Sequence, residues 1–274
     1  MLRVRPLLDL LTPGREHRYG SDHPSQRGEL HLPSGPGPHP VIVTIHGGSW
    51  SVGWSKRVMR ALAGELARRG SAVWNIEYRR LGGDEEGGWP NTFVDVAAAI
   101  DHLLELPEPL DTTDVTVFGH SAGGQLALWA ASRGRLPAGA PGASPRIEAV
   151  AAVSAAGVND LAQSWRDVPQ GIVGRLMGGG PDELPERYAI ADPIALVPLP
   201  IPVLLVHGTE DTTVSVRRSR NYARAARAAG GSVDLVEIPG PAGSHRSHVF
   251  PGSESFAAVL EWLAQRRRYA AATP

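Results

Sequence analysis

The 274-residue sequence predicts an α/β fold with a mostly parallel central sheet and helices on both faces. Short runs rich in β-branched residues alternate along the chain with helical segments, and such alternation builds βαβ units. The first clear strand, at residues 41–45, is apolar throughout, which is typical of a strand buried on both faces of a parallel sheet. In such a sheet, functional side chains gather where the strands end.

The remaining elements follow from the same patterns. Before strand 41–45 we expect an irregular stretch at 1–27, a strand at 28–32 and a turn-rich segment at 33–40. After it we expect a helix at 57–69, a strand at 72–76 and a helix at 91–105, followed by a strand at 115–118, a helix from 121 to 131 and a strand at 147–153. The last four expected elements are a strand at 203–206, a helix at 216–229, a strand at 233–238 and a helix at 253–268. We interpret residues 1–274 as one domain, with a small cap-like insertion at 157–195.

Composition excludes several classes of function. The formal net charge is −1, from 27 basic and 28 acidic residues, so no global field recruits nucleic acid or an anionic membrane surface, and a small neutral substrate is favoured. The chain has no cysteine, which excludes disulfides, thiolate metal sites and a cysteine nucleophile. His102 and His120 lack metal-ligand spacing with other residues, so we expect neither a metal nor another cofactor.

The chain shows no membrane or export signal. The apolar run at 7–11 is short and contains Asp9, unlike the core of a signal peptide. No run approaches the roughly eighteen apolar residues that a membrane helix needs. We therefore expect a cytoplasmic location, while the sequence indicates no particular oligomeric state.

One segment, Gly119-His120-Ser121-Ala122-Gly123-Gly124, carries the strongest chemical signal. It links the apolar strand at 115–118 to an alanine-rich helix, so Ser121 lies at the apex of a strand–turn–helix. A Gly-x-Ser-x-Gly turn strains the serine backbone and pushes its hydroxyl outward. There the free N–H of Ala122 and the helix dipole favour the negative charge that an acyl-transfer intermediate develops. The alternatives are a phosphate-binding turn and a serine that only caps its helix.

A serine nucleophile needs an imidazole base whose tautomer is held by a carboxylate. Asp211 follows the strand at 203–206, where a loop delivers a side chain to the carboxyl edge of the sheet. We favour it over the adjacent Glu210 because Val214 follows it at the expected spacing; the alternative is an exposed turn aspartate. The loop after the last strand contains both His245 and His248, and we favour His245 as the base with His248 as the alternative.

The first clear strand ends in His46-Gly47-Gly48-Ser49-Trp50, which resembles the His-Gly-Gly-Gly oxyanion loop of esterases and lipases. By that resemblance the backbone N–H groups of Gly48 and Ser49 act with that of Ala122 as oxyanion donors, and His46 holds the loop in shape. The order serine, aspartate, histidine along the chain is the order found in α/β-hydrolases.

Together these motifs resemble the α/β-hydrolase superfamily, specifically its esterase/lipase group of hormone-sensitive-lipase-like, feruloyl/acetyl-xylan-esterase-like and kynurenine-formamidase-like enzymes. The resemblance spans residues 40–263. The motifs Asn75-Ile76-Glu77-Tyr78-Arg79, Trp89-Pro90 with Asp95, and Asp192-Pro193 look like scaffold features of the same enzymes. Ser49 replaces the third glycine of the strict loop, which leaves the subgroup open.

The sequence thus predicts a serine esterase that cleaves short or small soluble esters through an acyl-enzyme, with Ser121, Asp211 and His245 as its triad. Trp50 and Trp165 are the candidate pocket-lining residues. Two alternatives remain: an amidase or arylformamidase with the same triad, and a non-catalytic binding protein on this fold.

Overall fold

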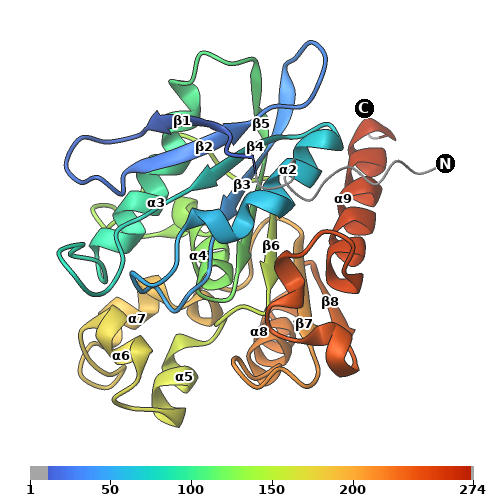
Figure 1. Cartoon of the computed structure of the whole chain (residues 1–274). Helices are drawn as coiled ribbons and strands as arrows, with labels where there is room; N and C mark the ends of the chain where they lie inside the picture. The colour runs from blue at the N-terminus through green and yellow to red at the C-terminus, as the bar shows by residue number, and fades with distance from the viewer. Residues whose placement is uncertain (1–11, 273–274) are drawn as a thin grey trace.

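The computed structural model describes residues 12–272, so the apolar run at 7–11 lies outside the described residues. In this part of the chain an eight-stranded sheet has the order β1-β2-β4-β3-β5-β6-β7-β8 (Figure 1). The strands are β1 (Arg15–Arg18), β2 (Arg27–His31), β3 (His39–Ile45), β4 (Ala72–Ile76), β5 (Leu110–His120), β6 (Ala151–Ala155), β7 (Val203–Gly208) and β8 (Val233–Ile238). β2 pairs antiparallel with both β1 and β4, and all other pairs are parallel. This sheet confirms the α/β-hydrolase fold.

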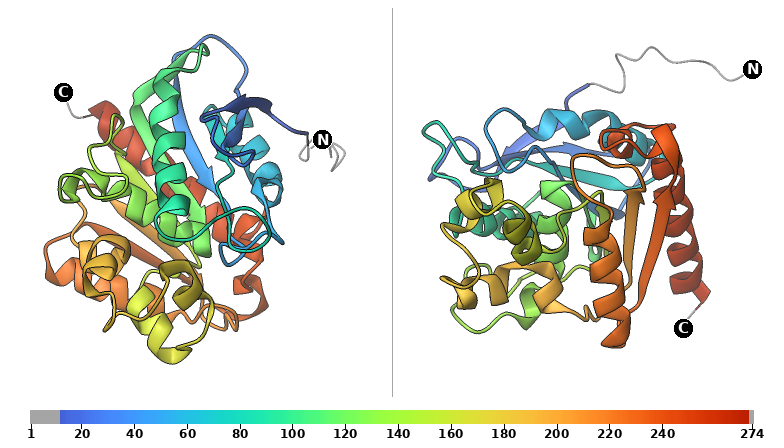
Figure 2. Two further views of the ribbon diagram at one scale, coloured as in Figure 1. Left: turned by 90° about the vertical axis from the view of Figure 1, so that its left-hand side faces the viewer. Right: turned by 90° about the horizontal axis from the view of Figure 1, so that it is seen from below.

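Helices cover both faces of the sheet. The principal helices are α2 (Arg60–Arg68), α3 (Asn91–Asp101), α4 (Ala122–Ala131), α8 (Arg217–Ala228) and α9 (Glu254–Ala272). α3, α4 and α8 pack on one face, and α2 and α9 pack on the other. Seen from below in Figure 2, α8 and α9 lie on opposite sides of β7 and β8. The strands alternate accordingly: Val41 and Val43 belong to the first core cluster, and Ile42 between them belongs to the second.

Two differences between the sequence expectations and the structure have a clear physical cause. Residues 15–18, expected to be irregular, form β1, an edge strand whose polar sequence resembles that of a loop. The strand expected at 147–153 is β6, at Ala151–Ala155. Ile147, the apolar residue at which the expected strand begins, lies outside the sheet. There the Asp101 carboxylate accepts hydrogen bonds from the N–H groups of Arg146 and Ile147, at 3.1 and 3.2 Å.

Residues 157–195, the cap segment, contain α5 (Leu161–Asp167), α6 (Ile172–Met177) and α7 (Pro185–Ala191). These helices lie together beyond the strand ends, at the lower left of Figure 1. Buried Asp192 fastens the segment, because its carboxylate accepts the N–H groups of Leu161 and Ala162, both at 2.8 Å. Burial raises the pKa of Asp192 to about 7, although the two hydrogen bonds by themselves would lower it. Among the described residues, no helix is long and apolar enough to cross a membrane.

The parallel strands place the candidate residues at one edge of the sheet. The loop at 46–50 follows β3, and Ser121 follows β5. Asp211 and His245 follow β7 and β8. Since parallel strands end at a common edge, four segments that are far apart in sequence meet there.

Candidate active site

Ser121 occupies a strained turn between β5 and α4. Its backbone has φ 55° and ψ −120°, a conformation that non-glycine residues rarely adopt. Its N–H donates to the carbonyl of Ala155 on β6 at 2.8 Å, which fixes the turn to the sheet. A Cβ on Gly119 would lie 1.8 Å from the carbonyl oxygen of Gly123, and a Cβ on Gly123 would lie 2.1 Å from the carbonyl oxygen of Ile45 on β3, so neither position has room for one. The strand and helix can therefore approach, and the serine side chain projects from the apex.

The histidine and the aspartate complete a hydrogen-bonded chain with this serine. Nδ1 of His245 lies 2.7 Å from Oδ2 of Asp211, and Nε2 lies 3.0 Å from Oγ of Ser121. Because a carboxylate only accepts, Nδ1 carries the hydrogen, and the lone pair of Nε2 faces the serine hydroxyl. The structure therefore brings the three predicted residues together in the geometry that a triad requires.

Four nitrogen atoms lie against the carboxylate of Asp211. Its Oδ1 accepts the N–H groups of Thr213 and Val214 at 2.8 and 3.0 Å, and its Oδ2 faces His245 and also Nε2 of His207, at 3.5 Å. Burial by itself would raise the pKa of this carboxyl, but the hydrogen bonds from the two histidines and from Val214 hold the pKa well below its ordinary value. Asp211 is thus a carboxylate that orients His245. The neighbouring Glu210 is exposed to solvent.

His248, the alternative base, lies away from Ser121. Its ring is fully buried, 6.3 Å from the ring centres of both His120 and His207. Neither ring nitrogen has a hydrogen-bond partner among the described residues. Burial, reinforced by the neighbouring His207, lowers the pKa of His248 to about 4. The geometry thus supports His245 as the base.

Two further histidines support the site, and sequence reasoning did not assign either of them a role. Burial and the neighbouring His245 lower the pKa of His120 to about 3, so its ring is neutral. Nε2 of His120 donates to the backbone carbonyl of His245 at 2.8 Å, which ties the histidine loop to the serine turn. Nε2 of His207 donates to the carbonyl of Val214 at 2.8 Å and closes the aspartate loop. In the sequence, what points to a role for them is their position near the end of a strand: His120 directly precedes Ser121, and His207 precedes Asp211 by four residues.

The loop after β3 lies against the serine turn. A Cβ on Gly47 would lie 2.7 Å from the carbonyl oxygen of His120 and 2.9 Å from Cβ of Ser121, so only glycine fits there. The N–H groups of Gly48, Ser49 and Ala122 have no acceptor among the described residues. Those of Gly48 and Ser49 lie in this loop, and that of Ala122 is the first of α4. They are the candidate oxyanion donors.

His46 anchors this loop from beneath. Its Nε2 lies 2.6 Å from Oε1 of Glu77, and its ring stacks on Tyr78 with the ring centres 4.4 Å apart. The other oxygen of Glu77 accepts the N–H of Lys56 at 3.1 Å. Burial raises the pKa of Glu77, but the positive charges and hydrogen bonds of its partners, His46 first, bring it below the ordinary value. His46 and Glu77 thus act on the loop from below, as scaffold.

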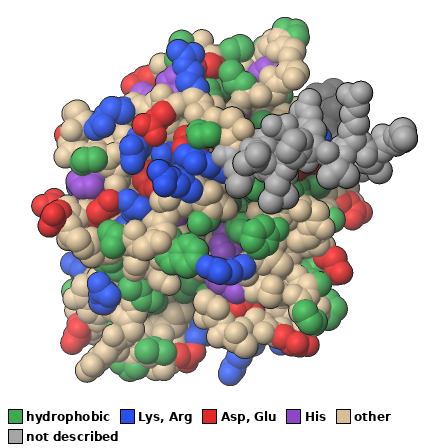
Figure 3. All heavy atoms as spheres, viewed as in Figure 1, with side chains coloured by type: hydrophobic (Ala, Val, Ile, Leu, Met, Phe, Trp, Pro, Cys, Tyr) green, Lys and Arg blue, Asp and Glu red, His purple; other side chains and the backbone are tan. Residues whose placement is uncertain are grey.

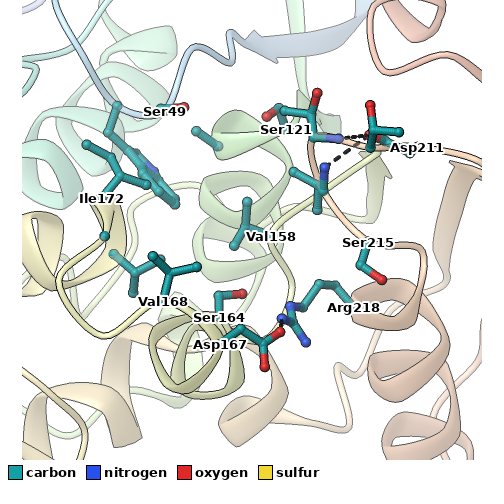
Figure 4. Close-up of a pocket in the computed structure, with 17 residues that line it drawn as sticks. Ser49, Ser121, Val158, Ser164, Asp167, Val168, Ile172, Asp211, Ser215 and Arg218 are labelled. Carbon is teal, nitrogen blue, oxygen red and sulfur yellow. Dashed lines mark hydrogen bonds and ion pairs between the residues drawn. The ribbon is translucent and has the colours of Figure 1, made fainter.

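A cavity of about 400 Å³ opens beside Ser121 (Figure 4). Residues of the cap segment, including Val158, Val168 and Ile172, form one of its walls. Trp50 lines it as expected, with its indole N–H donating to Gln125 at 3.2 Å. The structure differs from expectation at Trp165, which does not line this cavity because its indole packs inside the cap segment on glycine backbone.

The model of the BD-FAE family, whose members are α/β-hydrolase esterases, matches residues 29–225. The chain belongs to the BD-FAE family. The match runs from β2 into α8, so it includes the candidate oxyanion loop, the serine turn and Asp211 but stops before His245.

Curated relatives of this BD-FAE family member include esterase LipQ of Mycobacterium tuberculosis, 29% identical over 208 residues that cover 73% of the chain and 49% of the relative. Another is an uncharacterized peptidase, YtmA, of Bacillus subtilis, 28% identical over 70% of the chain and 71% of the relative. The chain thus spans about half the length of the mycobacterial relative.

Solved structures share the fold of the BD-FAE family member. A truncated carbohydrate esterase from gut microbiota superposes with a TM-score of 0.79 at 24% identity, covering 93% of this chain and 97% of the other. A butyrate-bound esterase from Thermogutta terrifontis superposes with a TM-score of 0.72 at 22% identity, covering 94% of each chain.

Proposed function

We propose that this protein is a serine hydrolase that cleaves carboxylic esters through an acyl-enzyme. The observation that carries the proposal is the unbroken hydrogen-bond chain from Ser121 through His245 to Asp211, at 3.0 and 2.7 Å. Membership of an esterase family supports the same chemistry.

In the proposed reaction, Oγ of Ser121 attacks the ester carbonyl carbon while Nε2 of His245 takes its proton. The carbonyl oxygen becomes an oxyanion that accepts from the N–H groups of Gly48, Ser49 and Ala122. When the ester C–O bond breaks, the protonated His245 gives its proton to the leaving oxygen. Water then repeats the sequence on the acyl-enzyme, releasing the acid and restoring Ser121. Each oxyanion donor contributes about 3 kcal/mol of transition-state stabilisation.

We propose a short acyl group. The cavity beside Ser121 has a volume of about 400 Å³, and Trp50, Val158 and Ile172 belong to the apolar part of its wall. Butyrate, bound by the Thermogutta relative, is an acyl group of suitable size. We expect p-nitrophenyl esters of two to four acyl carbons to be cleaved faster than those of eight or more.

A fluorophosphonate probe tests the nucleophile directly. The probe should label wild-type protein and leave Ser121→Ala unlabelled. Ser34→Ala is a matched control, because this serine is exposed in the loop between β2 and β3, at the edge of the sheet opposite to Ser121, and it should be labelled like wild type. Labelling that persisted in Ser121→Ala would place the nucleophile at another residue.

The amidase alternative uses the same triad, and the peptidase name of the Bacillus relative favours testing it. Rates on p-nitrophenyl butyrate and N-formylkynurenine, measured side by side, distinguish the two: faster cleavage of the formamide would replace esterase by arylformamidase. Inertness towards all these substrates and the probe would favour the non-catalytic alternative. A cytoplasmic location stays a prediction from the sequence.

A further inference from the structure

A second cavity, of about 480 Å³, opens on the other side of Ser121. Ser49, Ser121 and Thr213 line both cavities, so the serine lies between them. His245 lines only the second. Apart from His120 at the end of β5, the other residues of the second cavity come from the segment that runs from Gly47 to Ala61 in α2 and from the histidine loop.

This placement separates the two halves of an ester. The leaving oxygen must receive its proton from Nε2 of His245, so the leaving group lies on the side of the imidazole. That side is the second cavity. The first cavity, walled by the cap segment, is then left for the acyl group.

The second cavity carries two arginines that have no ion-pair partner in the part of the chain that the structure describes. Its lining includes Arg57 and Arg246 and contains no aspartate or glutamate. Among residues 12–272, neither guanidinium has an ion-pair partner; Arg246 lies over the ring of Trp54, 4.9 Å from its centre. The first cavity differs, because its arginine, Arg218, is paired with Asp167 (Figure 4).

Away from Ser121 and His245, much of the wall of the second cavity is apolar. Val58, Ala61 and Val249 line it, and Trp54 and Phe250 remain 40% and 56% exposed. Hydrophobic, histidine and Lys or Arg side chains gather near the middle of the face shown in Figure 3. Large apolar side chains exposed around a cavity favour a ligand that covers them. Such a ligand has an apolar body and an anionic group.

We propose that the second cavity selects alcohol leaving groups that combine an aromatic or alkyl body with a carboxylate, which Arg57 and Arg246 attract. This inference rests on the proposed esterase activity. The products are the short acid and a hydroxy acid whose hydroxyl proton comes from His245.

Two acetate esters test the charge preference. 4-Acetoxybenzoate and 4-acetoxybenzamide form the same acetyl-enzyme and differ in the charge of the leaving group. The ratio of their kcat/KM values, anionic over neutral, therefore cancels losses common to both substrates. We expect this ratio to fall about threefold in Arg57→Gln or Arg246→Gln and about tenfold in the double variant, as exposed ion pairs contribute modestly.

Two controls isolate the charge. Arg57→Lys keeps the positive charge and should retain most of the ratio. Arg224→Gln removes the charge of an exposed arginine on α8 that lines neither cavity, and it should leave the ratio unchanged. In wild type, added salt should lower the ratio by screening.

A ratio that stays unchanged in the double variant would overturn this inference and leave the esterase proposal standing, provided that the neutral ester is cleaved. Wild-type protein that cleaves neither ester would overturn both.

Discussion

Replacing Asp211 by asparagine should preserve the loop and remove nearly all activity. The amide oxygen can keep the hydrogen bonds from the N–H groups of Thr213 and Val214, now at 2.8 and 3.0 Å. That choice turns the amide NH₂ towards Nδ1 of His245, where Oδ2 now accepts at 2.7 Å. An amide that donates to Nδ1 forces the hydrogen onto Nε2, and Nε2 can then no longer accept the proton of Ser121.

The magnitude follows from this tautomer change. A wrong tautomer in an otherwise intact triad lowers kcat by about 10⁴-fold, or ~5.5 kcal/mol of transition-state stabilisation.

The assay is kcat and KM on p-nitrophenyl butyrate for wild type and Asp211→Asn, with circular dichroism to verify the fold. KM should change little, because Asp211 acts through His245. Glu210→Gln is the matched control, since this carboxylate is exposed, and it should stay near wild type. A loss below tenfold in folded Asp211→Asn would refute the assignment of Asp211.

Three further perturbations test the supporting structure. Gly47→Ala puts a methyl group against the backbone beneath Ser121 and should displace the oxyanion loop, lowering kcat/KM by about 10²-fold; undiminished activity would contradict the role of the loop. Glu77→Gln removes a buried carboxylate that contacts His46 and accepts the N–H of Lys56, and it should lower the free energy of unfolding by about 3 kcal/mol in urea titrations; a change within error would show that this carboxylate adds nothing. His248, with its pKa of about 4, stays neutral in the folded protein, while in the unfolded chain this histidine binds a proton from about pH 6.5 downward. Its contribution to the free energy of unfolding is therefore intact above pH 6.5. About 3 kcal/mol of that free energy is lost on acidification from pH 6.5 to pH 4. His248→Gln should flatten the dependence of the free energy of unfolding on pH between pH 6.5 and 4, and the control His23→Gln should not. Equal slopes in wild type and both variants would contradict the pKa shift of His248.

Local sequence patterns predicted most elements of the fold. Strands at 72–76 and 233–238 match β4 and β8 to the residue, because continuous apolar or alternating runs end at clear turns. Polar β1 was missed because an edge strand needs no apolar face. β6 was misplaced because the side chain of Asp101, distant in sequence, binds the N–H groups of residues 146 and 147 outside the sheet.

By itself the sequence determined the chemistry that this protein can carry: Gly119 to Gly124 shape a serine turn through neighbours a few residues away, and that information is local. Only the tertiary structure distinguished His245 from His248, because it places His245 against a serine 124 residues earlier in the chain and buries His248 away from that serine. The same holds for His120 and for the two cavities, which exist only where separate strand ends converge. Contacts across such separations depend on how strands and loops pack, which no local pattern encodes.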